Sequence, residues 1–143
     1  MQYLSINLKQ TANLAKRLVN ILNGGEIIAL TGDLGAGKTA FSQAIAKCLG
    51  VKEPVISPTF TIWQQYDCFH PIIKKLIHID AYRLSSGRDL VDLGINDWTS
   101  QKDVLIIIEW PEKINDWLPE NTLFFNLKHH PDGRLFELPN SLN

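Results

Sequence analysis

Short apolar runs and helically spaced apolar positions alternate along the chain. Residues 26–31, 75–79 and 104–108 form apolar runs typical of buried strands, and the unbroken apolar run at 104–108 indicates a strand covered on both faces. Residues 11–23 and 38–49 instead carry apolar side chains at helical spacing, and each stretch is followed by glycine. The pattern therefore predicts strands that alternate with helices.

Weaker patterns complete the expected order of elements. They predict a strand at 3–8, a strand at 60–66, a turn at 68–71, a short helix and turn at 89–98, and a terminal hairpin with strands at 122–127 and 134–138. We expect an α/β three-layer sandwich with a mainly parallel central sheet, helices on both faces and a ligand crevice at the carboxyl ends of the strands. With 143 residues, 45% of them hydrophobic, the chain suits a single domain over residues 1–143.

A glycine-rich motif lies between the strand at 26–31 and the helix at 38–49. Residues 32–39 read GDLGAGKT, a complete match to the phosphate-binding pattern G-x-x-x-x-G-K-[ST]. In this motif backbone N–H groups surround the α- and β-phosphates, Lys38 reaches the β/γ oxygens and the Thr39 hydroxyl binds Mg²⁺. The flanking strand and helix disfavour the alternative, a glycine turn without a ligand. The candidate nucleotide-binding residues are Gly32, Asp33, Leu34, Gly35, Ala36, Gly37, Lys38, Thr39 and Ala40.

The motif therefore predicts a fold of the P-loop NTPase type that binds ATP or ADP together with Mg²⁺. Adenine is favoured over guanine because the guanine-reading pattern Asn-Lys-x-Asp does not occur in the sequence. Phosphoryl chemistry on such a loop also needs a carboxylate for the metal and a group that orients the attacking atom.

Two carboxylates follow apolar strands and are candidates for this chemistry. Asp80 follows the run at 75–79, and Glu109 follows the run at 104–108. Because parallel strands end at the same edge of the sheet as the phosphate loop, we expect both side chains at the crevice. The residues alone leave open which carboxylate binds Mg²⁺ and which one orients the attacking group. A helix cap or a surface charge is the alternative for either residue.

The segment Ser57-Pro58-Thr59-Phe60 leads into the predicted strand at 60–66. Many P-loop enzymes keep a mobile segment here that closes a threonine hydroxyl over the γ-phosphate and Mg²⁺, so Thr59 is a candidate catalytic residue beside Lys38 and Asp80. The alternative is a turn before a strand. Two further residues stay open: Arg83 either supplies charge to the transition state or pairs with a surface acid, and Trp110 is either an interface anchor or a packing residue.

Composition and charge indicate the cellular compartment and the kind of partner to expect. The net charge of −1 and the pI of about 6.4 provide no basic field, so the chain is not expected to hold nucleic acid tightly by itself, and any contact with RNA should be indirect, through partners. Cys48 and Cys68 form neither a close pair nor a metal-spaced set, which indicates a reducing compartment. No apolar run approaches the ~20 residues that span a membrane, so a cytoplasmic protein without membrane contact is expected. The histidines lack metal-ligand companions and are interpreted as structural: His70, His78, His129 and His130.

Four strings, in order, resemble the TsaE (YjeE) family of bacterial ATPases. They are GDLGAGKT at 32–39, SPTFT at 57–61, HIDAYRL at 78–84 and IEWPE at 108–112. The first is generic, whereas the last two are specific at these spacings, and the similarity spans residues 8–134. The resemblance implies a role in forming threonylcarbamoyladenosine beside the anticodon of tRNAs that read codons beginning with A. The ATPase would dock on TsaD and TsaB partners, which perform the transfer, and ATP hydrolysis would reset their complex between turnovers.

The resemblance also implies roles for individual positions. Glu109 would be the second protein ligand of Mg²⁺, beside Thr39. Asp80 would position or activate water, and Thr59 would be the switch residue. Trp110 would lie in a segment that affects nucleotide and partner binding. Further nucleotide contacts are implied at Glu112, at Arg134 and, near the adenine, at Leu8.

One stretch departs from the family pattern. Residues 85–90 read SSGRDL where the family usually shows an acidic Asp-Pro-Glu-Glu-Leu stretch. The change removes acidic charge and adds a base in a segment suited to partner contact or regulation.

Two other classes of function compete with the partner-dependent ATPase. A small-molecule or nucleoside kinase would need a lid and an acceptor pocket, and the short chain shows neither an arginine-rich lid nor a long insertion. A GTPase-like switch or a nucleotide-binding scaffold without catalysis is the third class.

Overall fold

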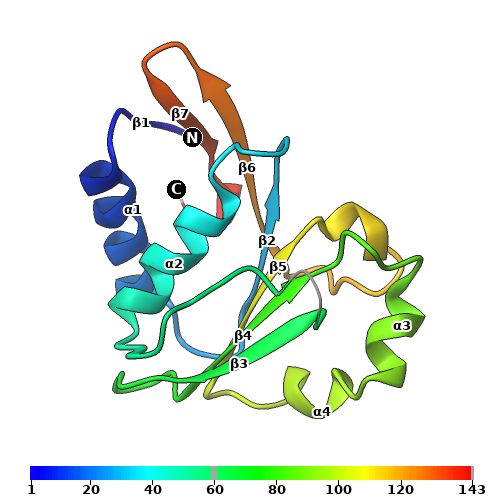
Figure 1. The fold of residues 1–143 in the computed structure, drawn as a ribbon. Coiled ribbons are helices and arrows are strands. Elements are labelled where there is room, and N and C mark those ends of the chain that lie inside the picture. Colours follow the sequence, from blue (N-terminus) through cyan, green and yellow to red (C-terminus); the bar gives the residue numbers. More distant parts are fainter. Residues whose placement is uncertain (59–60, 143) are drawn as a thin grey trace.

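A mixed sheet forms the centre of the computed structural model, which describes residues 1–58 and 61–142 (Figure 1). In this part of the chain seven strands are arranged in the order β1-β7-β6-β2-β5-β4-β3. The strands are β1 (Gln2–Ser5), β2 (Ile27–Thr31), β3 (Trp63–Asp67), β4 (Lys75–Asp80), β5 (Val104–Glu109), β6 (Leu123–His130) and β7 (Gly133–Glu137). The helices are α1 (Leu8–Ile21), α2 (Lys38–Cys48), α3 (Gly87–Asp92) and α4 (Asn96–Thr99), with 3₁₀ turns η1 (Pro111–Ile114) and η2 (Asn140–Leu142).

The centre of the sheet is parallel and its edges are antiparallel. Strands β6, β2, β5 and β4 run parallel to one another. β3 pairs antiparallel with β4 at one edge, and the hairpin of β6 and β7 carries β1 antiparallel at the other. The predicted α/β fold with a mainly parallel central sheet is therefore confirmed, and so is the terminal hairpin.

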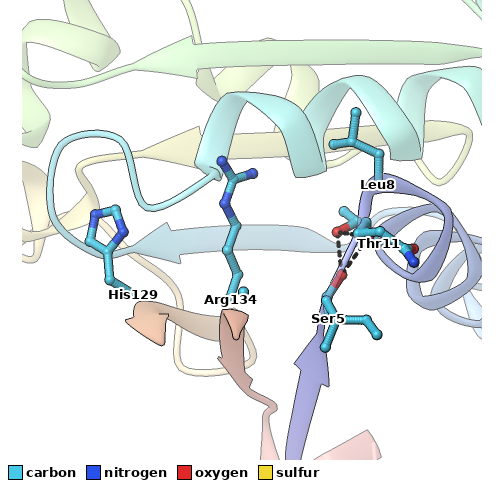
Figure 2. Close-up of a pocket in the computed structure, with 8 residues that line it drawn as sticks. Ser5, Leu8, Thr11, His129 and Arg134 are labelled. Atoms are coloured by element: carbon cyan, nitrogen blue, oxygen red, sulfur yellow. Dashed lines mark hydrogen bonds between the residues drawn. The ribbon is translucent and has the colours of Figure 1, made fainter. Parts of the chain in front are cut away.

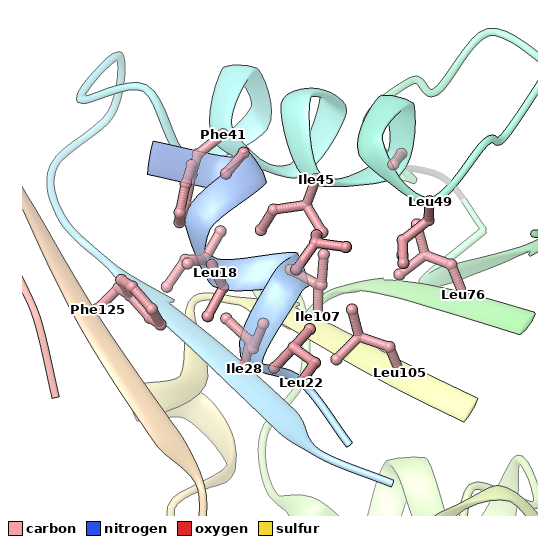
Figure 3. Close-up of a cluster of buried hydrophobic side chains, with 14 of the residues drawn as sticks. Leu18, Leu22, Ile28, Phe41, Ile45, Leu49, Leu76, Leu105, Ile107 and Phe125 are labelled. Atoms are coloured by element: carbon pink, nitrogen blue, oxygen red, sulfur yellow. The ribbon is translucent and has the colours of Figure 1, made fainter. Parts of the chain in front are cut away.

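Helices cover both faces of the sheet, as predicted (Figure 1). On the face of α1 and α2, an apolar cluster joins the two helices to the sheet through side chains such as Leu18, Ile45 and Ile107 (Figure 3). On the opposite face, Leu90 of α3 and Ile114 of η1 pack with Ile106. Neighbouring residues of β5 thus point into different clusters, which explains the unbroken apolar run at 104–108.

The structure differs from the predicted elements at several boundaries. The strand predicted at 3–8 ends at Ser5, because Asn7 begins α1 as its cap: its side-chain oxygen accepts a hydrogen bond from the Gln10 backbone N–H at 2.9 Å. The segment 89–98 contains parts of two short helices, separated by Gly94 in the left-handed conformation at φ 90°. The strand predicted at 60–66 is β3, which begins only after Ile62, itself at φ 68°. No helix in the described residues has the length and apolar character needed to cross a membrane.

Candidate active site

The glycine-rich loop connects the end of β2 to the start of α2, where the sequence pattern predicted it. Gly32 has φ 142°, and a Cβ at this position would lie 2.3 Å from the carbonyl oxygen of Leu127 in β6. Gly37 has φ 105°, and its Cβ would lie 2.7 Å from the side chain of Arg134. Only glycine fits these two positions without strain, because the backbone conformation disfavours a side chain at both and the fixed Leu127 carbonyl also excludes one at Gly32.

The loop opens into a cavity of about 550 Å³ at the carboxyl ends of the parallel strands. The cavity combines residues of the loop and of α2 with residues from β4, β5, β7 and the segments between them. Its lining consists of Leu34, Gly35, Gly37, Lys38, Thr39, Ala40, Ser57, Asp80, Tyr82, Glu109, Trp110 and Arg134. Most of the predicted site residues therefore line the same cavity, although the segments that carry them lie up to more than 90 positions apart in sequence.

A hydroxyl and a carboxylate meet across this cavity. Glu109 is the last residue of β5, is only 4% exposed, and accepts a hydrogen bond from Thr39 Oγ1 to its Oε1 at 3.2 Å. Thr39 is the second residue of α2, so this contact joins the phosphate loop to the sheet. A hydroxyl and a carboxylate oxygen at this separation are suited to share one Mg²⁺ ion, a cation that prefers oxygen ligands.

Asp80 lies beside Glu109, at the rim of the same cavity. The two residues are register partners on the adjacent parallel strands β4 and β5, so their side chains share a face of the sheet. Asp80 Oδ1 accepts a hydrogen bond from the Tyr82 backbone N–H at 3.0 Å, and Oδ2 accepts one from Ser57 Oγ at 3.4 Å. The second bond ties the start of the predicted switch segment to the cavity. Thr59 itself lies outside the described residues.

Lys38 is almost fully buried beside the phosphate loop, at the start of α2. Its Nζ donates hydrogen bonds to the carbonyl oxygens of Gly32 and Asp33 and lies 4.0 Å from the centre of the Trp110 ring. Burial lowers the pKa of Lys38 below its ordinary value of 10.5, and the nearby carboxylates, Glu109 first among them, oppose this shift. A desolvated ammonium group among acids gains stabilisation when phosphate oxygens come within hydrogen-bonding reach.

Trp110 follows Glu109 directly and adopts a conformation unusual for its type. Its backbone is left-handed, with φ 59° and ψ 50°, and it precedes the 3₁₀ turn η1. The ring lies under the Lys38 ammonium group and packs in a T-shaped arrangement with the Tyr82 ring at a centroid distance of 5.1 Å. A bulky residue in this conformation stores strain that the surrounding contacts must hold. Trp110 is therefore part of the cavity wall over Lys38.

A second cavity of about 370 Å³ lies on the other side of Arg134 (Figure 2). It is lined by Ser5, Ile6, Asn7, Leu8, Thr11, His129, Gly133 and Arg134. Figure 2 shows the Arg134 side chain extending from β7 toward the start of α2, between His129 and Leu8. Because Arg134 lines both cavities, it connects the phosphate loop to a pocket bounded by the first helix.

Several predicted residues lie outside these linings. Glu112 belongs to η1, and its charge acts to raise the pKa of Lys38. Gly32, Asp33 and Ala36 belong to the loop but do not line the cavity, and Asp33 takes part through its carbonyl oxygen. Arg83 is exposed and lies outside the cavity lining.

Sequence reasoning assigned no site role to Tyr82, which lines the cavity, or to His78, which was interpreted as structural. His78 of β4 is fully buried, and its Nε2 lies 2.6 Å from Glu109 Oε2. The signal that could have identified it is its position two residues before Asp80, which places both side chains on the same face of β4. The other histidines have no contact with Glu109 among the described residues, and no group of three metal-binding side chains occurs there.

Comparisons with known proteins agree with this geometry. The family model described as "Threonylcarbamoyl adenosine biosynthesis protein TsaE" matches residues 5–136. A protein of Streptomyces coelicolor named tRNA threonylcarbamoyladenosine biosynthesis protein TsaE is 40% identical over 77% of this chain and 73% of its own length. The proteins of the same name from Treponema pallidum and Bacillus subtilis are 35% and 33% identical, over 93% and 92% of this chain and 95% and 80% of their own lengths.

A solved structure supports the same assignment. The crystal structure of Bacillus subtilis YdiB superimposes with a TM-score of 0.76 at 29% sequence identity, and the match covers 95% of this chain and 82% of YdiB. The family match extends over the phosphate loop, both carboxylates and Arg134. The chain therefore belongs to the TsaE family of P-loop NTPase-type proteins, whose role is in tRNA threonylcarbamoyladenosine biosynthesis.

Proposed function

We propose that the protein is a Mg²⁺-dependent ATPase that acts with TsaD and TsaB type partners in the threonylcarbamoyladenosine modification of tRNA, hydrolysing ATP to reset their complex. The observation that carries this proposal is the contact between Thr39 and Glu109, which sets a hydroxyl and a carboxylate at the base of the cavity that opens from the phosphate loop. Family membership supports the pathway.

The residues of the cavity fit a magnesium-bound triphosphate. The loop and the first turn of α2 contribute backbone N–H groups, which have no partner within a helix and favour an anion. Lys38 binds the β/γ oxygens, while Thr39 and Glu109 hold the metal. When bound, Mg²⁺ neutralises charge that develops on the phosphate oxygens.

Two further roles are proposed: one residue orients the attacking water, and another closes over the γ-phosphate. Asp80 orients the attacking water, because it is a carboxylate beside the metal site whose two oxygens are already held by Tyr82 and Ser57. Thr59, two residues after Ser57, closes over the γ-phosphate. In this division of roles, Glu109 is the carboxylate that binds the metal.

The second cavity provides a place for the nucleoside. Leu8 presents an apolar surface there, 72% exposed, and Arg134 can contact the phosphates from the boundary between the two cavities. Glu112 contributes a charge near Lys38. We therefore propose that ATP lies across Arg134, with the adenine toward Leu8 and the phosphates in the loop.

Partner dependence follows from the openness of the site. Asp80 and Tyr82 lie at the rim of the cavity, so the γ-phosphate environment is incompletely enclosed and hydrolysis by the isolated protein is slow. We propose that the partners complete the site and contact the tRNA, and that the protein acts in the cytoplasm as a single domain over residues 1–143.

Affinity copurification from cells of the source organism tests the assignment of partners. We expect tagged protein to recover a TsaD–TsaB pair, and the recovery to depend on nucleotide. Recovery of a metabolic complex without that pair would contradict the proposal and favour the kinase alternative.

A further inference from the structure

A buried imidazole lies behind the proposed metal ligand. His78 of β4 is 0% exposed, and its Nε2 contacts Glu109 Oε2 at 2.6 Å. The carboxylate uses its other oxygen, Oε1, to accept from Thr39 at 3.2 Å. The two oxygens of Glu109 thus have different partners on opposite sides, one in the sheet and one at the phosphate loop.

The hydrogen bond has a defined direction. An ionised carboxylate only accepts, so the proton lies on Nε2 of the imidazole. Nδ1 of the same ring is buried and has no hydrogen-bond partner among the described residues.

We propose that His78 is a positioning residue: its Nε2–H fixes the Glu109 carboxylate so that Oε1 faces Thr39 and the metal. This inference rests on the proposed Mg²⁺-nucleotide site. Hydrogen bonds from a second layer of residues orient carboxylate ligands in many metal sites. Without the bond, the Glu109 side chain gains rotational freedom and its Oε1 is no longer held toward Thr39.

The surroundings of His78 argue against a purely packing role. On the same face, its neighbours Leu76 and Ile107 are apolar and fully buried, and among the described residues polar ones lie only toward Gln64 of β3 and toward the Asp80 and Glu109 end of the strands. An aliphatic side chain would fill such a site without leaving a buried nitrogen unpaired, whereas His78 leaves Nδ1 unpaired. The one polar contact that His78 makes in the described structure is the contact with Glu109.

The test compares His78→Leu with His78→Gln. Leucine removes the donor and keeps an apolar side chain of similar size, whereas the glutamine amide can place an N–H near the position of Nε2. The measurement is calorimetric titration of ADP at a series of Mg²⁺ concentrations, which requires no catalysis. We expect the Mg²⁺ concentration for half-maximal enhancement of ADP binding to rise about 10-fold or more in His78→Leu, the range for lost outer hydrogen bonds to metal ligands, and to recover in His78→Gln.

A matched control separates positioning from packing. Ile77→Val removes a methylene from the same strand but on the opposite face, away from Glu109, and should leave the Mg²⁺ midpoint unchanged. If His78→Leu does not fold by circular dichroism, His78→Asn takes its place, because its shorter amide falls short of Oε2. The proposal is overturned if the Leu or Asn variant keeps the wild-type midpoint, or if Gln fails to restore it. Wild-type protein that binds ADP without any Mg²⁺ dependence would instead contradict the proposed function itself.

Discussion

Lys38→Ala is expected to reduce ATP hydrolysis by about 10³-fold or more and to weaken nucleotide binding, because it removes the ammonium group that donates to the carbonyl oxygens of the loop. A charged group interacts more strongly with other charges in a site with little water than in bulk water. The burial that lowers the pKa of Lys38 is typical of such a site. Calorimetric titration with ADP measures the binding effect, and a coupled turnover assay in the partner complex measures the rate.

Lys47→Ala is the matched control for this substitution. Lys47 lies in the last turn of the same helix, is exposed, and does not line the cavity, so its loss should change neither quantity. Wild-type turnover in the Lys38 variant would mean that the loop is not the active site.

Glu109→Gln and Asp80→Asn are expected to produce different defects. Glutamine at position 109 keeps the shape of the side chain but removes the proposed anionic ligand of the metal, so the Mg²⁺ concentration needed for activity should rise. Asparagine at position 80 leaves the metal site intact and impairs the orientation of water, so the rate should fall at an unchanged Mg²⁺ requirement. Mg²⁺ titrations of ATPase activity in the partner complex distinguish the two.

Asp67→Asn serves as the control for the loss of a carboxylate. Asp67 is an exposed residue of β3 that pairs with Lys75 at 3.3 Å, a contact that contributes little to stability, and it lies outside the cavity lining. A shifted Mg²⁺ midpoint in the Asp80 variant, with none in the Glu109 variant, would show that the two roles are reversed.

The parts of the site predicted from sequence are those set by local patterns. The strand, loop and helix around residues 32–39 are contiguous, so apolar spacing and glycines suffice to place them. Asp80 and Glu109 were expected at one crevice because each follows a buried strand, and the register between β4 and β5 confirms that they are neighbours.

The parts that were missed depend on contacts between distant segments. The partner of His78 is Glu109, and although the spacing of His78 from Asp80 places both on one face of β4, the contact itself follows from how β4 and β5 align. The left-handed backbone of Trp110 likewise has no sequence signal, since residues of this type rarely adopt it. The predicted boundaries of the helices were wrong where a single residue decides the boundary, as Asn7 and Gly94 do.

Steady-state ATPase activity, measured for the protein alone and with a purified TsaD–TsaB pair, tests the central claim most directly. We expect slow hydrolysis by the protein alone and a clear increase with the pair, because in the proposed function the partners enclose the exposed rim of the cavity around Asp80. The increase should require Mg²⁺ and should be absent with the Lys38→Ala variant. A rate that is unchanged by the partners, or an increase that persists in the Lys38→Ala variant, would contradict the account.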